Sequence, residues 1–441
     1  MTAPTVDQGI LRRPYALTTL GAWSLVFLAA FESLAITTIM PVIAADLNGR
    51  GLYSLAFSAT LAAGVVGTVA AGSWADRRGP TTPLFAAIGV FTLGLAVAGT
   101  AQSMDVFVAG RFLQGLGAGA ETVALYVVIA KVYPAHLHTR LFGAFAAAWV
   151  LPSLVGPFVA GVVTDVLSWH WVFLGVIVLV AAATVMIVPA VRGRAHEPAD
   201  RRPGEGVRIA AATAVAVSVV ALSSGRELGR SVWVVAPLAL VVIAVTVRPL
   251  FPAGTYRARP GLPAIIALCV AAGAVFFGTE VYLPLLLHDR YGLPPWLSGI
   301  TLTAAAISWA LASNLQGRFS ERLRDGVAMR IGSVLLAAGP LVELATVLLR
   351  LHPAVAAVGW FAAGAGMGTL YPRVAALVLS LSTPGEEGFN VAARTVADSV
   401  GGSIALAVTG LLFGSGSFVT VFAFSTAVGV LVVITARRSA R

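Results

Sequence analysis

Residues 17–44 read LTTLGAWSLVFLAAFESLAITTIMPVIA, a run of 28 residues in which Glu32 is the only charged side chain. A helix needs about 20 mostly apolar residues to cross the hydrocarbon layer of a membrane, so this run is long enough to span one. Thirteen further apolar runs follow along the 441-residue chain, each bounded by charges, Gly/Pro clusters or polar turns. The sequence therefore predicts an all-α integral membrane protein with 14 spans.

The composition also indicates a lipid solvent. Apolar residues make up 58% of the chain, charged residues only 11%, and the mean hydropathy is +0.90. A soluble protein carries about 25% charged residues, so a set of soluble domains is excluded. The single cysteine, Cys269, excludes a disulfide framework and is expected to be a packing residue. The spans are expected at about 17–44, 53–74, 82–102, 105–130, 141–163, 169–190, 209–222, 232–247, 262–287, 296–316, 327–349, 354–381, 389–413 and 417–436.

Two of these runs, 209–222 and 232–247, are shorter than the others. The first has only 14 residues, a length that also suits a re-entrant or interfacial segment. A spanning hairpin is favoured, because two apolar runs in a water-exposed loop would promote aggregation.

The remaining twelve runs form two similar blocks, 17–190 and 262–436. A shift of 245 residues aligns their starts and places Gly72, Asp76 and Arg77 on Gly317, Glu321 and Arg322. Two six-helix halves related as parallel repeats are an architecture of secondary transporters, with the substrate route between the halves. The expected domains are an N-terminal six-helix bundle over 1–190, a linker with two additional transmembrane helices over 191–261, and a C-terminal six-helix bundle over 262–441.

The net charge of +10 is explained by topology. If the N-terminus is cytoplasmic, alternation of 14 spans puts 21 of the 29 basic residues on that side and five in the outer loops. This bias follows the positive-inside rule, so both termini are expected in the cytoplasm and nucleic acid is not expected as a partner. The first run is too long for a cleavable signal, and we expect a multi-pass protein of the cell inner membrane.

Four motifs are recognisable. After the second span, residues 72–79 read GSWADRRG and match the pattern G-x-x-x-D-R-x-G; residues 111–119, RFLQGLGAG, match R-x-x-Q-G. Residues 143–161, GAFAAAWVLPSLVGPFVAG, resemble G-x8-G-x3-G-P-x2-G, and residues 168–173, SWHWVF, resemble W-R-W-x-F. On these motifs the chain resembles the major facilitator superfamily, and specifically its drug:proton antiporters with 14 helices.

The resemblance implies roles for two groups of motif residues. The motif at residues 72–79, here called the signature loop, would stabilise the outward-facing state. A cytoplasmic turn that only fixes topology has the same composition. The fifth-span motif would seal against proton leak and favours export over import, although close helix packing alone also explains its glycines. The gating residues are Gly72, Asp76, Arg77 and Gly79 with a weaker counterpart in Glu321 and Arg322, and the antiporter-motif residues are Pro152, Gly156, Pro157 and Gly161.

Charges inside spans are the other functional candidates, because each costs about 2.5–3.5 kcal/mol at mid-helix. Glu32 in the first span and Arg111 in the fourth lie at depths that differ by roughly 9 Å, within reach of two long side chains or a bridging water. Burial favours the neutral acid and an adjacent Arg favours the carboxylate, so such a pair could exchange its partner for a proton. A static buried ion pair is the alternative.

The other intraspan charges are less sharply assigned. Arg394 and Asp398 are spaced i, i+4, so they either neutralise each other or leave Asp398 as a proton carrier. Glu280 has no local basic partner and is the second proton or cation candidate. Glu343 is expected to snorkel toward Arg350 near the outer face. Possible cavity residues are Gln114, Glu121, Tyr282, Arg373 and Arg394.

The predicted function is proton-coupled export of amphiphilic or drug-like small molecules by alternating access, with the proton gradient as energy source and no cofactor or metal. Protons, membrane lipids and a small or lipid-like substrate are the expected partners of a monomer. Export of lipids or glycolipids and proton-coupled import of a small solute are alternatives within transport. A membrane-embedded enzyme or sensor is the alternative from another class, but the sequence offers no catalytic constellation and no G-x4-G-K-[ST] nucleotide motif.

The 14-span topology makes a direct prediction for Gly225, which lies in the turn between the two shorter runs. In a Cys269→Ala background, a cysteine at position 225 should react with a membrane-impermeant thiol reagent added outside intact cells. Reaction only in inverted vesicles would replace the spanning hairpin with a re-entrant linker.

Overall fold

A computed structural model describes residues 10–12, 15–191, 204–224, 229–318, 324–383, 386–413 and 416–439. The described residues contain α-helices and short 3-10 turns and no strand. Fourteen helical segments are long and apolar enough to cross a membrane, with α9 and α10 together forming one of them. The predicted all-α membrane architecture with 14 spans is confirmed.

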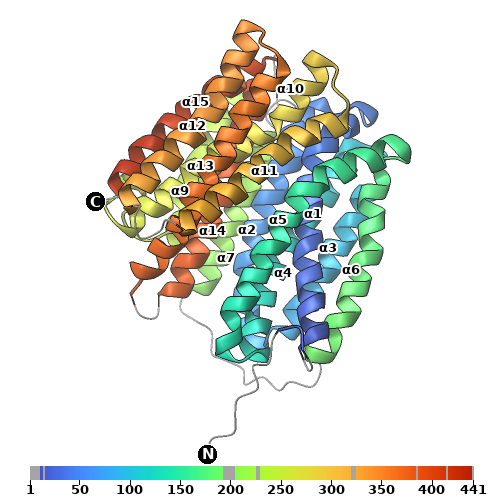
Figure 1. Cartoon of the computed structure of the whole chain (residues 1–441), viewed down its shortest axis with the longest axis vertical. Coiled ribbons are helices and arrows are strands. Elements are labelled where there is room, and N and C mark those ends of the chain that lie inside the picture. Colours follow the sequence, from blue (N-terminus) through green and yellow to red (C-terminus); the bar gives the residue numbers. More distant parts are fainter. Residues whose placement is uncertain are drawn as a thin grey trace, which may run out of the picture.

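The helices fall into two groups of six spans and an intervening hairpin. Figure 1 shows the first group, drawn blue to green, on one side of the molecule and the last group, drawn yellow to red, on the other. The first group is α1 (Ala16–Asp46), α2 (Tyr53–Arg78), α3 (Thr81–Gly99), α4 (Met104–Val132), α5 (Ala135–Val166) and α6 (His170–Val191). The hairpin is α7 (Glu205–Ser223) and α8 (Val232–Thr246). The last group is α9 (Leu262–Glu280), α10 (Tyr282–Tyr291), α11 (Pro295–Arg318), α12 (Asp325–Leu349), α13 (Pro353–Ser380), α14 (Glu387–Leu412) and α15 (Phe418–Ser439).

The span 262–291 is interrupted at Val281, between α9 and α10. Pro284 has no N–H to donate to the carbonyl of Glu280 four residues earlier, so the helical hydrogen-bond ladder breaks there. The hydroxyl of Tyr53 on α2 donates to the carbonyl of Val281 (2.9 Å). The break is thus tied to the first group of helices by a buried hydrogen bond.

Three glycines bring α4 into backbone contact with its neighbours. A Cβ at Gly115 would overlap the carbonyl of Thr60 on α2, and one at Gly119 would overlap that of Gly64. Gly117 faces α3, where a Cβ would lie 2.5 Å from the backbone nitrogen of Phe91. Small residues of this kind allow transmembrane helices to approach closely and gain dispersion contacts that larger side chains prevent.

The last group repeats this arrangement on α13. Gly364 and Gly368 leave no room for a Cβ against Ala305 and Trp309 of α11, and Gly366 is equally tight against Leu336 of α12. The pattern Gly-x-Gly-x-Gly therefore occurs at the same place in both halves, as expected for parallel repeats.

Several polar contacts between the two halves lie toward one end of the molecule. We call the end where α1 begins and α2 ends the N-face, and the end where α1 ends and α2 begins the far face. At the far face, Arg50 donates two hydrogen bonds of 3.1 Å to Asp289. Deeper within the spans, Thr303 of α11 donates to the carbonyl of Leu154 on α5 (3.2 Å). The Arg50 and Tyr53 bonds thus join the halves toward the far face.

The hairpin helix α7 follows α2 along its length. Arg77 near the end of α2 pairs with Glu205 (3.1 Å), and Ser58 bonds to Ser223 (2.9 Å) at the other end of α7. The guanidinium of Arg208 lies 4.7 Å from the ring centroid of Phe389 on α14. The first turns of α7 thus contact both halves near the N-face, where Figure 1 also draws α7 beside α14.

The α4 glycines predict a specific stability effect. Gly115→Ala should destabilise the protein by about 1–3 kcal/mol, because the added methyl group overlaps the α2 backbone. The melting temperature in detergent measures this. Gly175→Ala on α6 is the matched control, since nothing lies within 4 Å of its Cβ position, and it should not lower the melting temperature. Equal melting temperatures for both variants would contradict the packing argument.

Candidate functional site

A buried cluster of three polar side chains joins α1 to α4. Arg111 Nη1 donates to Glu32 Oε1 and to Gln114 Oε1 (2.6 Å). The side chains of Arg111 and Glu32 are only 3% and 4% exposed. Arg111 Nε and Gln114 Nε2 have no hydrogen-bond partner among the described residues. The attraction between the charges of Glu32 and Arg111 therefore holds this cluster together.

The protonation state of Glu32 decides whether Arg111 has a counter-charge. As a carboxylate it neutralises Arg111, and neither charge is left alone in a region of low dielectric. If Glu32 takes up a proton, Arg111 loses its counter-charge and must find another partner or water. A change of protonation at Glu32 is therefore also a change in the contact between α1 and α4.

In the other half, the position that corresponds to Arg111 is occupied by an aromatic residue, Trp360 of α13. Trp360 precedes Gly364 by four residues, as Arg111 precedes Gly115, and it stacks on Phe276 of α9 with ring centroids 4.8 Å apart. The repeat therefore preserves the helix packing but replaces the ion pair with an apolar contact.

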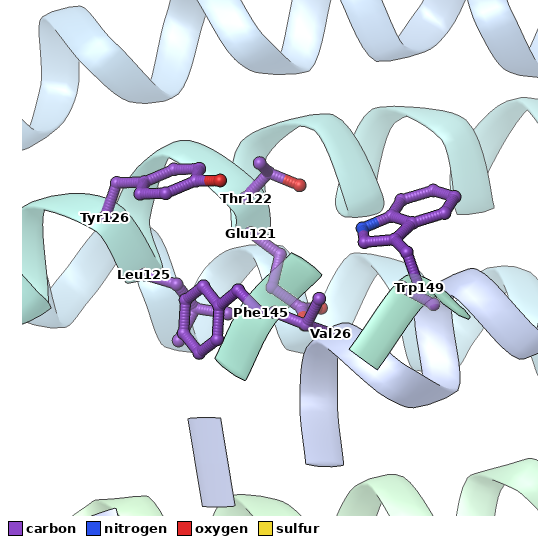
Figure 2. A pocket seen from close by; sticks show the side chains of 8 residues that line it. Val26, Glu121, Thr122, Leu125, Tyr126, Phe145 and Trp149 are labelled. Atoms are coloured by element: carbon purple, nitrogen blue, oxygen red, sulfur yellow. The ribbon is translucent and has the colours of Figure 1, made fainter. Parts of the chain in front are cut away.

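A second buried acid, Glu121 of α4, lines a cavity of about 150 Å³. Glu121 is 3% exposed, and its Oε2 has no hydrogen-bond partner among the described residues. In the view of Figure 2, Glu121 lies between Phe145 and Trp149, with Tyr126 beside them. The cavity is lined by Val26 and Ala29 of α1, Glu121, Thr122, Leu125 and Tyr126 of α4, and Phe145 and Trp149 of α5.

A third polar cluster lies on α13 and α14. Tyr371 donates to Asp398 Oδ1 (2.7 Å), and the guanidinium of Arg394 lies 4.9 Å from the Tyr371 ring centroid. Within the described part of the chain, Arg394 and Asp398 form no direct ion pair. Tyr371 thus contacts both of these charged side chains of α14.

The two remaining intraspan acids lie at different places. Glu280 is 7% exposed and sits at the break between α9 and α10, next to Tyr282, which packs on Tyr53 and Phe413. Glu343 is fully buried against Gly359 of α13, and both its carboxylate oxygens lack a partner among the described residues. The expectation that Glu343 snorkels toward Arg350 is wrong, because its side of α12 faces α13.

The signature loop is described in part. Gly79 ends α2 in a positive-φ conformation (+77°), and Arg77 pairs with Glu205 of the linker. Gly72 lies within α2, 3.8 Å from Val123 of α4 as measured from its Cβ position. The side chain of Asp76 and the residues Glu321 and Arg322 lie outside the described residues.

The fifth-span motif lies on the seam between the halves. A Cβ at Gly161 would lie 2.8 Å from the backbone of Trp296, and a Cβ at Gly299 would lie 2.9 Å from the carbonyl of Pro157. Both contacts join α5 to α11. Pro152, inside the same helix, and Gly156, which faces Phe31 of α1 at 3.4 Å, extend the motif toward the first helix.

Arg373 does not line the cavity of Figure 2. It pairs with Asp325, the first residue of α12, at 2.7 Å, and Asp325 is 48% exposed.

Several site residues have no sequence signal of their own. Glu205, Asp289 and Tyr371 interact with Arg77, Arg50 and Asp398 only through the fold. Phe145 and Trp149 belong to an apolar stretch that does not reveal which of its faces borders a cavity. The cost of a charge inside a span identified the acids but not their neighbours.

Comparisons with known proteins agree with this architecture. The family model described as Major Facilitator Superfamily matches residues 22–350. The multidrug efflux pump SdrM of Staphylococcus aureus is 21% identical, with 92% of both chains covered. A probable multidrug-efflux transporter of Mycobacterium tuberculosis, Rv1634, is 25% identical, with 85% of this chain and 83% of the relative covered. A crystal structure of a POT family transporter in complex with a thioalcohol-conjugated peptide superposes with a TM-score of 0.73 at 12% identity, covering 97% of this chain and 96% of that chain.

The Glu32–Arg111 contact makes a stability prediction. Arg111→Gln should lower stability by about 3–5 kcal/mol, because it leaves a carboxylate buried without a counter-charge. The double variant Glu32→Gln/Arg111→Gln should regain part of this loss. Arg330→Gln, which changes an exposed Arg on α12, is the matched control and should leave the melting temperature unchanged. A double variant less stable than Arg111→Gln would show that the two side chains are not energetically coupled.

Proposed function

This chain belongs to the Major Facilitator Superfamily and is a multi-pass membrane transporter, and we propose that it exports amphiphilic, drug-like small molecules in exchange for protons. The two six-helix halves would alternate between opening at the N-face and opening at the far face. Its relatives named as multidrug efflux pumps support this substrate class and the direction of transport.

The buried Glu32–Arg111 pair is the observation that carries the proton-coupling proposal. Of the four ion pairs formed between described side chains, this one alone is buried on both sides. A proton taken up by Glu32 releases Arg111 and so couples protonation to a change of contacts between α1 and α4. Asp398 and Glu280 in the C-terminal half are the further proton candidates.

The arrangement of the halves supports a cytoplasm-facing state. The excess of Arg and Lys in the loops on the N-terminal side favours a cytoplasmic N-face. Contacts such as Arg50–Asp289 hold the halves together at the far face. In such a state, substrate enters from the cytoplasm, and transport requires the far-face contacts to separate.

The signature loop and the α5–α11 seam would have separate roles in this transport cycle. The signature loop with Asp76 and Arg77 would stabilise the opposite, outward-facing state, and the α5–α11 seam with Gly161 would limit proton leak. The protein would act as a monomer in the cell inner membrane, in contact with lipids over its exposed apolar helices.

The proposed role of Glu32 is tested by transport in proteoliposomes with an imposed pH gradient. Glu32→Gln should abolish accumulation of a substrate against its gradient while leaving downhill exchange measurable, because Gln keeps the size and polarity of Glu but cannot titrate. Accumulation at the wild-type rate by a stable Glu32→Gln protein would remove Glu32 from the mechanism and assign the role to Glu280 or Asp398.

Glu343→Gln is the matched control for this experiment. Glu343 is also a fully buried acid, but it lies on α12 against α13 and outside the cavity. The control variant should accumulate substrate as the wild type does.

A further inference from the structure

Five exposed arginines lie in two parts of the sequence that contain no acid. Neither residues 231–279, which include α8 and the loop before α9, nor residues 399–441, which include α15, contain an Asp or Glu. The described arginines in these two ranges are Arg248, Arg257, Arg259, Arg437 and Arg438, and all five are exposed. Basic residues without acidic neighbours in the sequence produce a positive local potential that attracts anions.

The fold brings these arginines to one place. The chain between α8 and α9 forms two short 3-10 turns, η3 (Arg248–Leu250) and η4 (Thr255–Arg257). The guanidinium of Arg248 lies 5.8 Å from the ring centroid of Tyr256. Arg438 of α15 donates to the backbone carbonyl of Arg257 (3.4 Å), across 181 residues of sequence. The end of the linker and the end of the last helix therefore share one basic surface, which we call the arginine patch.

No described acid neutralises the arginine patch. None of its five members belongs to an ion pair between described side chains. By contrast, Arg77 pairs with Glu205 of α7, and Arg373 pairs with Asp325 of α12. Like charges at one place repel each other, so an anion from outside the chain would stabilise the patch.

Exposed apolar side chains lead along two helices to the arginine patch. They lie three to seven residues before Arg248 on α8 and before Arg438 on α15. Spacings of three, four and seven residues keep side chains on one face of a helix, so each apolar face ends near a cation. The exposed apolar residues are Val241 and Val245 of α8 and Leu431 and Ile434 of α15.

Tyr256 places the arginine patch at the level of the membrane surface. Its ring is exposed, and its hydroxyl donates to the carbonyl of Ala244 in the last turn of α8. Tyrosine is enriched where the hydrocarbon layer meets water, because its ring is apolar and its hydroxyl is polar. A ligand that spans this boundary would therefore meet apolar side chains on one side and guanidinium groups on the other.

We propose that the arginine patch binds the phosphate head group of an anionic phospholipid, with the acyl chains along the exposed faces of α8 and α15. The attraction between the five cations and an anionic head group selects this lipid over a zwitterionic one. The bound lipid would connect the end of the linker to the last helix of the C-terminal half. The cavity of Figure 2 is lined by α1, α4 and α5 and plays no part in this site.

Fluorescence quenching by lipids with brominated acyl chains tests the proposal in reconstituted vesicles. In a Cys269→Ala background, Val241→Cys carries a fluorophore one turn deeper than Val245. Brominated phosphatidylglycerol should bind beside this label at least about tenfold more tightly than brominated phosphatidylcholine, since each arginine near the surface adds to the attraction. The same label at Val178→Cys, an exposed apolar position on α6, should show no such preference.

Two substitutions of the arginine patch test whether its charge selects the lipid. Arg248→Gln/Arg257→Gln/Arg259→Gln should remove the preference for phosphatidylglycerol. None of these three guanidinium groups donates a hydrogen bond within the described part of the chain, and position 257 keeps the carbonyl that Arg438 contacts. Arg248→Lys/Arg257→Lys/Arg259→Lys keeps the charge and should keep the preference, which separates loss of charge from a folding defect.

A charge-matched control and a soluble phosphate complete the experiment. Arg12→Gln/Arg290→Gln/Arg330→Gln removes three exposed arginines elsewhere and should keep the preference at the Val241 label. Excess glycerol 3-phosphate, which has a phosphate but no acyl chain, should not reduce quenching by phosphatidylglycerol. Equal quenching by the two lipids in the wild type, a preference that survives the three Gln substitutions in the patch, or displacement by glycerol 3-phosphate would overturn the lipid site.

Discussion

Backbone contact at the glycines of α4 is the interaction on which the rest of the structure depends. In a membrane, lipid tails are as apolar as the helices, so association comes from close packing. Gly115 and Gly119 allow α4 to pack closely against α2, and Gly117 allows it to pack closely against α3. With α4 packed in this way, Arg111 reaches Glu32 of α1, and Glu121 borders the cavity that residues of α1 and α5 also line. Packing of small residues therefore decides where the charges lie.

The repeat keeps this packing and changes its chemistry. On α13, Gly364, Gly366 and Gly368 occupy the same relative positions, but Trp360 stands where α4 has Arg111. The buried ion pair between the first and fourth helices thus belongs to the N-terminal half alone. In the C-terminal half, a hydrogen bond from Tyr371 to Asp398 instead joins α13 to α14. The two halves therefore share one helix packing but contain different buried polar contacts.

The seams between the halves use small residues as well. Gly161 and Gly299 bring α5 against α11, and Gly410 of α14 lies against Ser54 of α2. At these seams, a small residue allows helices of the two halves to approach closely. The linker helix α7 lies beside one of them, with Glu205 bonded to α2 and Arg208 over a ring of α14. The linker thus contacts both halves.

The sequence by itself determined the spans, the two-block organisation and the identity of the buried acids, because run length and the cost of an intraspan charge are local properties. It also placed Glu32 and Arg111 at compatible depths. The tertiary structure decided which charges meet, across 79 residues for Glu32 and Arg111. It also decided that one carboxylate oxygen of Glu121 and both of Glu343 have no partner in the described part of the chain. Transmembrane helices are apolar on every side, so periodicity does not distinguish the face toward lipid from the face toward a neighbouring helix. That is why Glu343 was expected to snorkel toward Arg350 near the outer face, whereas it lies buried against α13.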